Sequence, residues 1–152
     1  MRLPIAAASH TAFVLPMEEL QQAWVEVLFT QTLREVAPLA REISLHLMGD
    51  PLAHPKLCCL LEITKHYRLP VTITTAGHLM DEERMRLLMH PIVKQVNFSL
   101  NSFNENPKKW SFEFYLERLS VFLDKIKGVR DDLFVNWRLW NLKEGEESSF
   151  NL

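Results

Sequence analysis

The stretch best placed for chemistry lies in the first half of the chain. Residues 42–55, EISLHLMGDPLAHP, read as a buried strand that stops at Gly49-Asp50-Pro51 and continues through a short loop into a helix. Both open and closed parallel sheets bind their ligands at the carboxyl ends of the strands. We therefore expect a ligand site just beyond this strand.

Four predicted strands (42–48, 70–76, 93–101 and 133–140) carry further candidates, because polar and apolar residues alternate along each of them. Successive side chains point to opposite faces of a sheet. We expect the apolar face to meet helices and the polar face to line a wet, concave interior, where a ligand or water satisfies the polar groups. The alternative is a sheet with helices on one side only, whose polar face meets solvent. The polar positions are Ser44, His46, Thr72, Thr74, Gln95, Asn97, Ser99, Asn101, Asn136 and Arg138.

Helices and strands alternate along the whole chain. Helical spacing of apolar residues and β-branched runs predict strands at 2–7, 42–49, 70–76, 93–101 and 133–141, and helices at 17–39, 57–67, 81–89 and 112–127. Asp81 is expected to cap the third helix. This alternation implies parallel strands with right-handed crossovers. Units of roughly 30 residues suit either a doubly wound sheet or part of a barrel.

Composition bounds the class of protein. The 152 residues suggest one domain, here 1–142, followed by a polar, acidic tail at 143–152 that we expect to be disordered. The formal net charge of -2 favours neither nucleic acid nor a membrane surface as a partner. The only cysteines, Cys58 and Cys59, are adjacent and cannot form a disulfide framework, so a cytoplasmic location fits best. We interpret both thiols as small buried apolar groups.

Four segments together resemble a known family. They are GDPLAHPKL, VTITTAGHLMDEE, QVNFSLNSF and VNWRLWNL, in that order, from about Glu42 to Leu142. Each resembles the corresponding strand or strand-end motif of the radical S-adenosylmethionine (radical SAM) superfamily. The resemblance covers roughly two thirds of the chain.

The resemblance implies a fold and a cofactor. The fold would be an α/β partial (β/α) barrel of about five parallel strands with helices on the outer face. Its lumen would hold S-adenosylmethionine, which a [4Fe-4S] cluster cleaves reductively in family enzymes to start radical chemistry. By the same resemblance, seven residues would contact the cofactor or the substrate. Gly49, Asp50 and Pro51 would approach the cofactor's amino group, and Thr74, Ser99, Asn101 and Arg138 would line the cofactor or substrate side.

The chain departs from the family at the cluster. Family enzymes hold it through C-x3-C-x2-C after the first strand, where this chain has Ala7, Thr11 and Val14. None of the three offers a thiolate, so we expect no cluster on this chain. Two hypotheses follow: the core of a radical SAM enzyme that is inactive as written, or a non-catalytic module that binds a small molecule or a protein.

A third possibility, an unrelated α/β hydrolase or transferase, has little support. The chain contains no G-x-S-x-G, P-loop or G-x-G-x-x-G motif and shows no zinc-ligand spacing. The last predicted strand, 133–141, has no following strand to pair with. Because an unpaired edge is a template for association, we expect self-association or a partner protein along Leu133 to Trp140.

Overall fold

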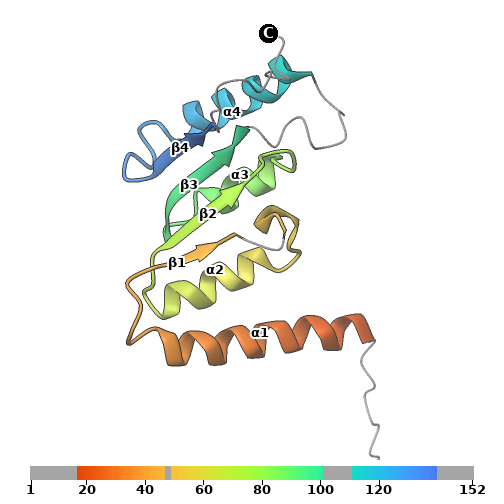
Figure 1. Cartoon of the computed structure of the whole chain (residues 1–152), viewed down its shortest axis with the longest axis vertical. Coiled ribbons are helices and arrows are strands. Elements are labelled where there is room, and N and C mark those ends of the chain that lie inside the picture. The colour runs from red at the N-terminus through yellow and green to blue at the C-terminus, as the bar shows by residue number, and fades with distance from the viewer. Residues whose placement is uncertain (1–16, 47–48, 101–110, 140–152) are drawn as a thin grey trace, which may run out of the picture.

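The structure, a computed structural model, describes residues 17–46, 49–100 and 111–139, in which helices and strands alternate (Figure 1). The elements are α1 (Met17–Val36), β1 (Ile43–Leu45), a 3₁₀ turn η1 (Pro51–Ala53), α2 (Leu57–His66), β2 (Val71–Thr75), α3 (Glu82–Leu88), β3 (Val93–Ser99), α4 (Phe112–Ile126) and β4 (Phe134–Arg138). Each lies within a predicted segment except η1, and β1 is shorter than its predicted strand.

The four described strands form one parallel sheet in the order β1-β2-β3-β4. The predicted α/β class with parallel strands is therefore confirmed. The described strands number four rather than about five, and they form an open sheet in which no barrel closure is seen. The first predicted strand, 2–7, and the tail, 143–152, lie outside the described residues.

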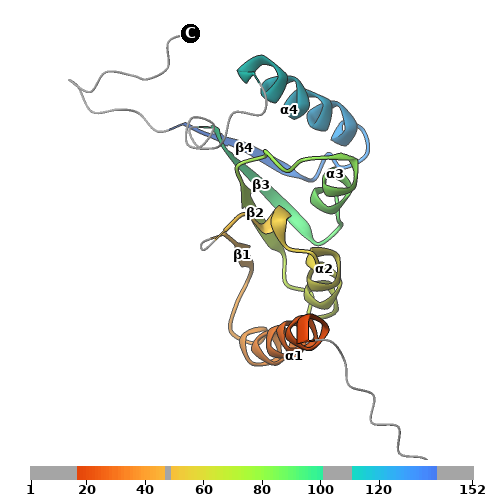
Figure 2. The same cartoon turned by 90° about the vertical axis from the view of Figure 1, so that its right-hand side faces the viewer.

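Helices α2, α3 and α4 lie on one face of this sheet (Figure 2). The apolar phase of the strands points to them, as predicted, because Ile73, Val96 and Phe98 are fully buried in the core. The helices contribute matching stripes of apolar residues. The core residues from the helices include Leu57, Leu61, Met85, Leu88, Tyr115, Leu119, Phe122 and Ile126.

Helix α1 lies alongside α2, at the β1 end of the sheet (Figure 1). The Lys56 Nζ, just before α2, is 3.1 Å from the Glu26 Oε1 of α1. Within the described part of the chain, no helix combines the length and apolar character needed to cross a membrane.

One residue of β3 has no partner in β2. Val71 pairs with Val93 and Thr72 pairs with Gln95, so Lys94 is the extra residue of a bulge. Because of this bulge, Val93 and Val96 are both fully buried although they are three positions apart.

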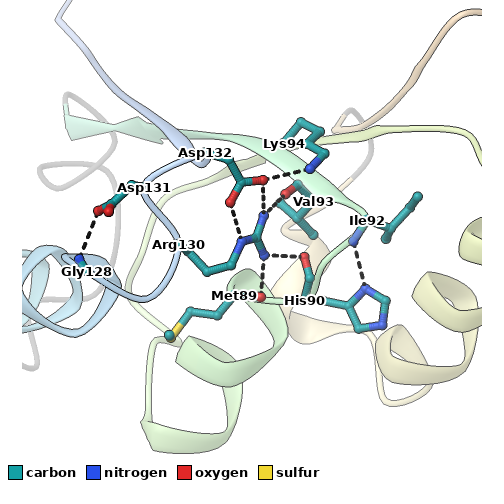
Figure 3. Close-up of polar contacts among 9 residues, drawn as sticks. All are labelled: Met89, His90, Ile92, Val93, Lys94, Gly128, Arg130, Asp131 and Asp132. Atoms are coloured by element: carbon teal, nitrogen blue, oxygen red, sulfur yellow. Dashed lines mark hydrogen bonds and ion pairs between the residues drawn. The ribbon is translucent and has the colours of Figure 1, made fainter.

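The amino-terminal ends of β3 and β4 are joined by Arg130, whose side chain is 11% exposed (Figure 3). Its guanidinium donates to the carbonyl oxygens of Met89 and His90 at the end of α3, the latter at 2.8 Å, and to that of Val93 at 2.7 Å. Asp132 Oδ1 accepts from Arg130 Nε at 2.8 Å. Hydrogen bonds from Arg130, and then from Lys94, hold the pKa of the Asp132 carboxyl well below its usual range.

We predict that Arg130→Met lowers the free energy of unfolding by about 3 kcal/mol, because three backbone carbonyls lose a charged donor. Arg130→Lys should recover only part of the loss, since an ammonium cannot reproduce the fork of donors. The control Arg86→Met, on the exposed side of α3, should change the value by less than about 0.5 kcal/mol. Urea denaturation measures all three, and equal effects at positions 130 and 86 would contradict the structural role of Arg130.

Candidate functional site

The loop after β1 is tied to the end of β2 by the carboxylate of Asp50. Asp50 Oδ1 accepts from the backbone N–H of Leu52 at 3.0 Å and so caps η1. Asp50 Oδ2 accepts from Thr75 Oγ1 at 2.7 Å and from the backbone N–H of Ala76 at 2.9 Å. Three hydrogen bonds to one carboxylate therefore link the carboxyl ends of two neighbouring strands.

The turn after β2 packs against α4. Gly77 adopts a φ of +77°, and a Cβ at this position would lie 3.3 Å from Tyr115 Cε2 and from Phe98 Cδ1, so a side chain there would be both strained and crowded. The Tyr115 hydroxyl donates to the carbonyl oxygen of Ala76 at 2.7 Å. Burial, reinforced by the negative charge of Asp50, raises the pKa of Tyr115 to about 12.

The polar face of the sheet, opposite the helices, includes Thr72, Thr74, Gln95, Asn97 and Asn136. Asn97 stands at its centre and is 1% exposed. Its Nδ2 donates to Thr74 Oγ1 at 3.2 Å, and its Oδ1 accepts from Gln95 Nε2 at 2.9 Å and from Asn136 Nδ2 at 3.1 Å. A hydrogen-bonded ladder of amides and a hydroxyl therefore crosses β2, β3 and β4.

The polar phase thus faces away from the helices. Both sequence interpretations, a wet concave interior and a solvent-facing sheet, required this. An enclosed, concave interior is not seen in the described part of the chain, where helices lie on one side of the sheet only (Figure 2).

The structure brings some of the predicted site residues together. Ser99 and Arg138 are partners in register at the carboxyl ends of β3 and β4. Thr74 joins the ladder through Asn97. Gly49, Asp50 and Pro51 follow β1, at the carboxyl ends of the strands, as Ser99 and Arg138 do. Among the described residues, no carboxylate pairs with the exposed Arg138 guanidinium. Asn101, Ala7, Thr11 and Val14 lie outside the described residues.

A cavity of about 420 Å³ opens between the end of β1 and the start of α2. Gly49, Asp50 and Pro51 line it, as do His54 and Leu57 of the following turn and helix, which sequence reasoning had not assigned to a site. The spacing of His54-Pro55 after Gly49-Asp50-Pro51 was the available signal. Its lining includes His46 of the polar phase but no residue of β2, β3 or β4, so the cavity lies at the β1 end of the sheet, away from Asn97.

The prediction for the cysteines was wrong. Cys58 and Cys59 are both exposed, because α2 turns Leu57, Leu60, Leu61 and Thr64 inward and leaves positions 58 and 59 on its outer side. Within the described ranges, no three His, Cys, Asp or Glu side chains are grouped so that they could hold a metal ion.

Comparisons with protein-family models, with curated proteins and with solved structures found no match to this chain. The resemblance to the radical SAM superfamily therefore stays a prediction from the sequence motifs.

We predict that Tyr115 titrates near pH 12, which the ultraviolet absorbance of tyrosinate measures in a Tyr67→Phe background. The folded-state pKa lies above the unfolded value of about 10, so the stabilisation from the neutral phenol is complete below pH 10. It should be lost as the pH rises from 10 towards 12. The free energy of unfolding should fall less over this interval in Tyr115→Phe, and a titration of Tyr115 near pH 10 would contradict the prediction.

Proposed function

We propose that this chain is a radical SAM-like domain that binds a small polar molecule at the carboxyl edge and polar face of its sheet without carrying out reductive cleavage. S-adenosylmethionine is the first candidate ligand. The alternative within the same fold is a protein-binding module, which the outer edge of β4, unpaired among the described strands, favours.

The observation that supports a ligand is the ladder around Asn97. A parallel sheet is usually covered on both faces, and its strands are then apolar on both. Here one face carries a buried amide that three neighbouring side chains satisfy. Gln95 and Asn136 each use one N–H in the ladder, so, within the described part of the chain, their amide oxygens remain as acceptors for a ligand.

Arg138 supplies the charge that such a site needs. Its guanidinium lies at the carboxyl end of β4, next in register to Ser99. A planar guanidinium can hold a carboxylate through two parallel hydrogen bonds, and S-adenosylmethionine carries a carboxylate on its methionine part. The amide groups of the polar face suit the donor and acceptor edge of a purine.

Asp50 fits the cofactor less well than the motif suggests. Its carboxylate already accepts from Leu52, Thr75 and Ala76, so it acts as a brace between strands rather than as a receptor for an amino group. Gly49 remains suited to close backbone approach, because its φ is +133° and no atom beyond its chain neighbours lies within 4 Å of a Cβ built there.

The iron–sulfur cluster does not fit the donor set of this chain. Positions 7, 11 and 14 hold Ala, Thr and Val, and the two thiols of the sequence are adjacent on α2. Clusters of this kind need thiolates that converge from separate positions. We therefore assign the domain a binding role and no redox step.

The finer fold is also part of the proposal. Parallel βα units place each helix between two consecutive strands. Helix α1 lies beside α2, at the β1 end of the sheet, where it would cover a strand paired with the outer edge of β1. Residues 2–7 would supply that strand and complete a five-stranded partial barrel.

We predict that calorimetry detects binding of S-adenosylmethionine and that Arg138→Met weakens it roughly 10- to 100-fold, the effect of one lost charge-assisted hydrogen bond or pair. Arg86→Met makes the same chemical change on the helical side and should leave the affinity unaltered. Absence of binding at millimolar ligand, or equal losses in the two variants, would rule out the proposed ligand site.

A second prediction concerns the residues that replace the cluster ligands. The unmodified chain should be colourless and free of iron after anaerobic reconstitution with iron and sulfide. The triple variant Ala7→Cys, Thr11→Cys, Val14→Cys should become brown and contain iron, because it restores the three-thiolate spacing of the family.

The control moves the three cysteines one position along, to Ala8→Cys, Ala12→Cys and Leu15→Cys, and should take up no stoichiometric iron. Iron in the unmodified chain would show that the loop has been aligned wrongly. A folded triple variant without iron would contradict the resemblance to the cluster loop and favour an unrelated binding module.

A further inference from the structure

The outer edge of β4 carries unusual apolar exposure. In the described part of the chain β4 pairs with β3 alone. Phe134 is 71% exposed, Trp137 45% and Leu139 67%. A strand edge with free N–H and C=O groups and large apolar side chains is a template for another strand.

We propose that a second copy of this chain covers this edge, with the two β4 strands antiparallel about a two-fold axis through Asn136. The sequence Phe134-Val-Asn-Trp-Arg138 is complementary to itself in this register. Phe134 lies opposite Arg138 of the partner subunit, and Val135 opposite Trp137 of the partner subunit. Each of these pairs occurs twice, and Asn136 meets Asn136 of the partner subunit on the axis.

The faces of the two sheets agree in this arrangement. Phe134, Asn136 and Arg138 are in phase with Gln95, Asn97 and Ser99 on one face, whereas Val135 and Trp137 are in phase with Val96 and Phe98 on the other. A two-fold axis perpendicular to the sheet preserves both faces. Arg138 can therefore lie on the Phe134 ring of the partner subunit as a cation–π pair. Val135 and Trp137 form aromatic–aliphatic cross-strand pairs.

Helix α4 presents a matching surface. Its Arg118 donates to the Met80 carbonyl oxygen and its Lys125 Nζ is 2.8 Å from Glu82 Oε1, so this flank of α4 faces α3. The opposite flank therefore faces the free edge of the sheet. It carries the half-buried apolar side chains Phe112, Leu116 and Leu123.

The proposed axis brings the two α4 helices together, since α4 lies over β3 and β4, where Phe122 packs on Phe98 with ring centroids 5.8 Å apart. Helices pack at about 8–10 Å when apolar flanks meet. The alternative of β4 pairing with β1 of another copy is head-to-tail and would build a ring or an open chain of subunits rather than a dimer. The closed antiparallel pair is the arrangement that the side chains of β4 complement.

Sedimentation equilibrium of the full chain tests the proposal. We expect twice the 17.8 kDa mass of one chain at micromolar concentration. Asn136→Asp and Asn136→Lys each place two like charges opposite each other on the axis and should raise the dimer dissociation constant at least about fivefold. An equimolar mixture of the two variants should recover the dimer, because only the mixed pair places Asp opposite Lys.

Phe134→Ala provides a second variant that leaves the core untouched, since Phe134 is exposed. It should weaken the dimer, whereas Leu39→Ala, an exposed apolar residue after α1, should not. A monomeric mass for the unmodified chain at millimolar concentration would overturn the proposal. A dimer that tolerates both charges at position 136, or that the mixture fails to recover, would overturn the register. Neither result depends on whether the chain binds S-adenosylmethionine.

Discussion

The structure depends on one constraint: each strand of the sheet must pack apolar side chains against helices on one face and satisfy polar side chains on the other. The apolar phase meets that demand through burial, as Ile73, Val96 and Phe98 show. The polar phase meets it through Asn97, which is buried at the centre of the sheet and would be costly without partners. Because Thr74, Gln95 and Asn136 supply those partners, the ladder also specifies the register of β2, β3 and β4.

The two ends of the parallel strands, here called the carboxyl and amino rims of the sheet, are each stabilised by one charged side chain that makes several hydrogen bonds to backbone groups. The charge is negative at one rim and positive at the other. At the carboxyl rim, the Asp50 carboxylate accepts from backbone N–H groups of two successive βα connections. At the amino rim, the Arg130 guanidinium donates to backbone carbonyls at the end of α3 and the start of β3 (Figure 3). Connections between parallel strands leave unpaired backbone groups at both rims. One multivalent side chain at each rim satisfies several of them and links consecutive units.

Much of the fold was predictable because apolar residues recur at every second position in the strands and about every 3.6 positions in the helices, and the two patterns are easily told apart in this sequence. The alternation in β2 and β3, the Asp81 cap of α3 and the buried stripe of α4 all follow from local patterns. The exposure of Cys58 and Cys59 runs against the usual burial of free cysteine. It follows instead from the helical spacing of Leu57, Leu60 and Leu61, which leaves both thiols off the buried stripe of α2. The bracing role of Asp50 was hidden. Its partners Thr75 and Ala76 are 25 and 26 residues away, and only the parallel pairing of β1 with β2 brings them together.

The bulge at Lys94 has a consequence for how the chain tolerates changes in length. Strand β3 enters the sheet with Val93 facing the helices and needs Val96 to face them too, which a regular strand with three steps between them would forbid. The extra residue at position 94 restores the phase at the amino rim, before the strand reaches Asn97. Deleting it would leave Val93, Gln95 and Val96 in ordinary alternation and would remove the exposed ion pair between Lys94 and Asp132. The carboxyl end of the sheet is thus insulated from the deletion of this one residue at the opposite end.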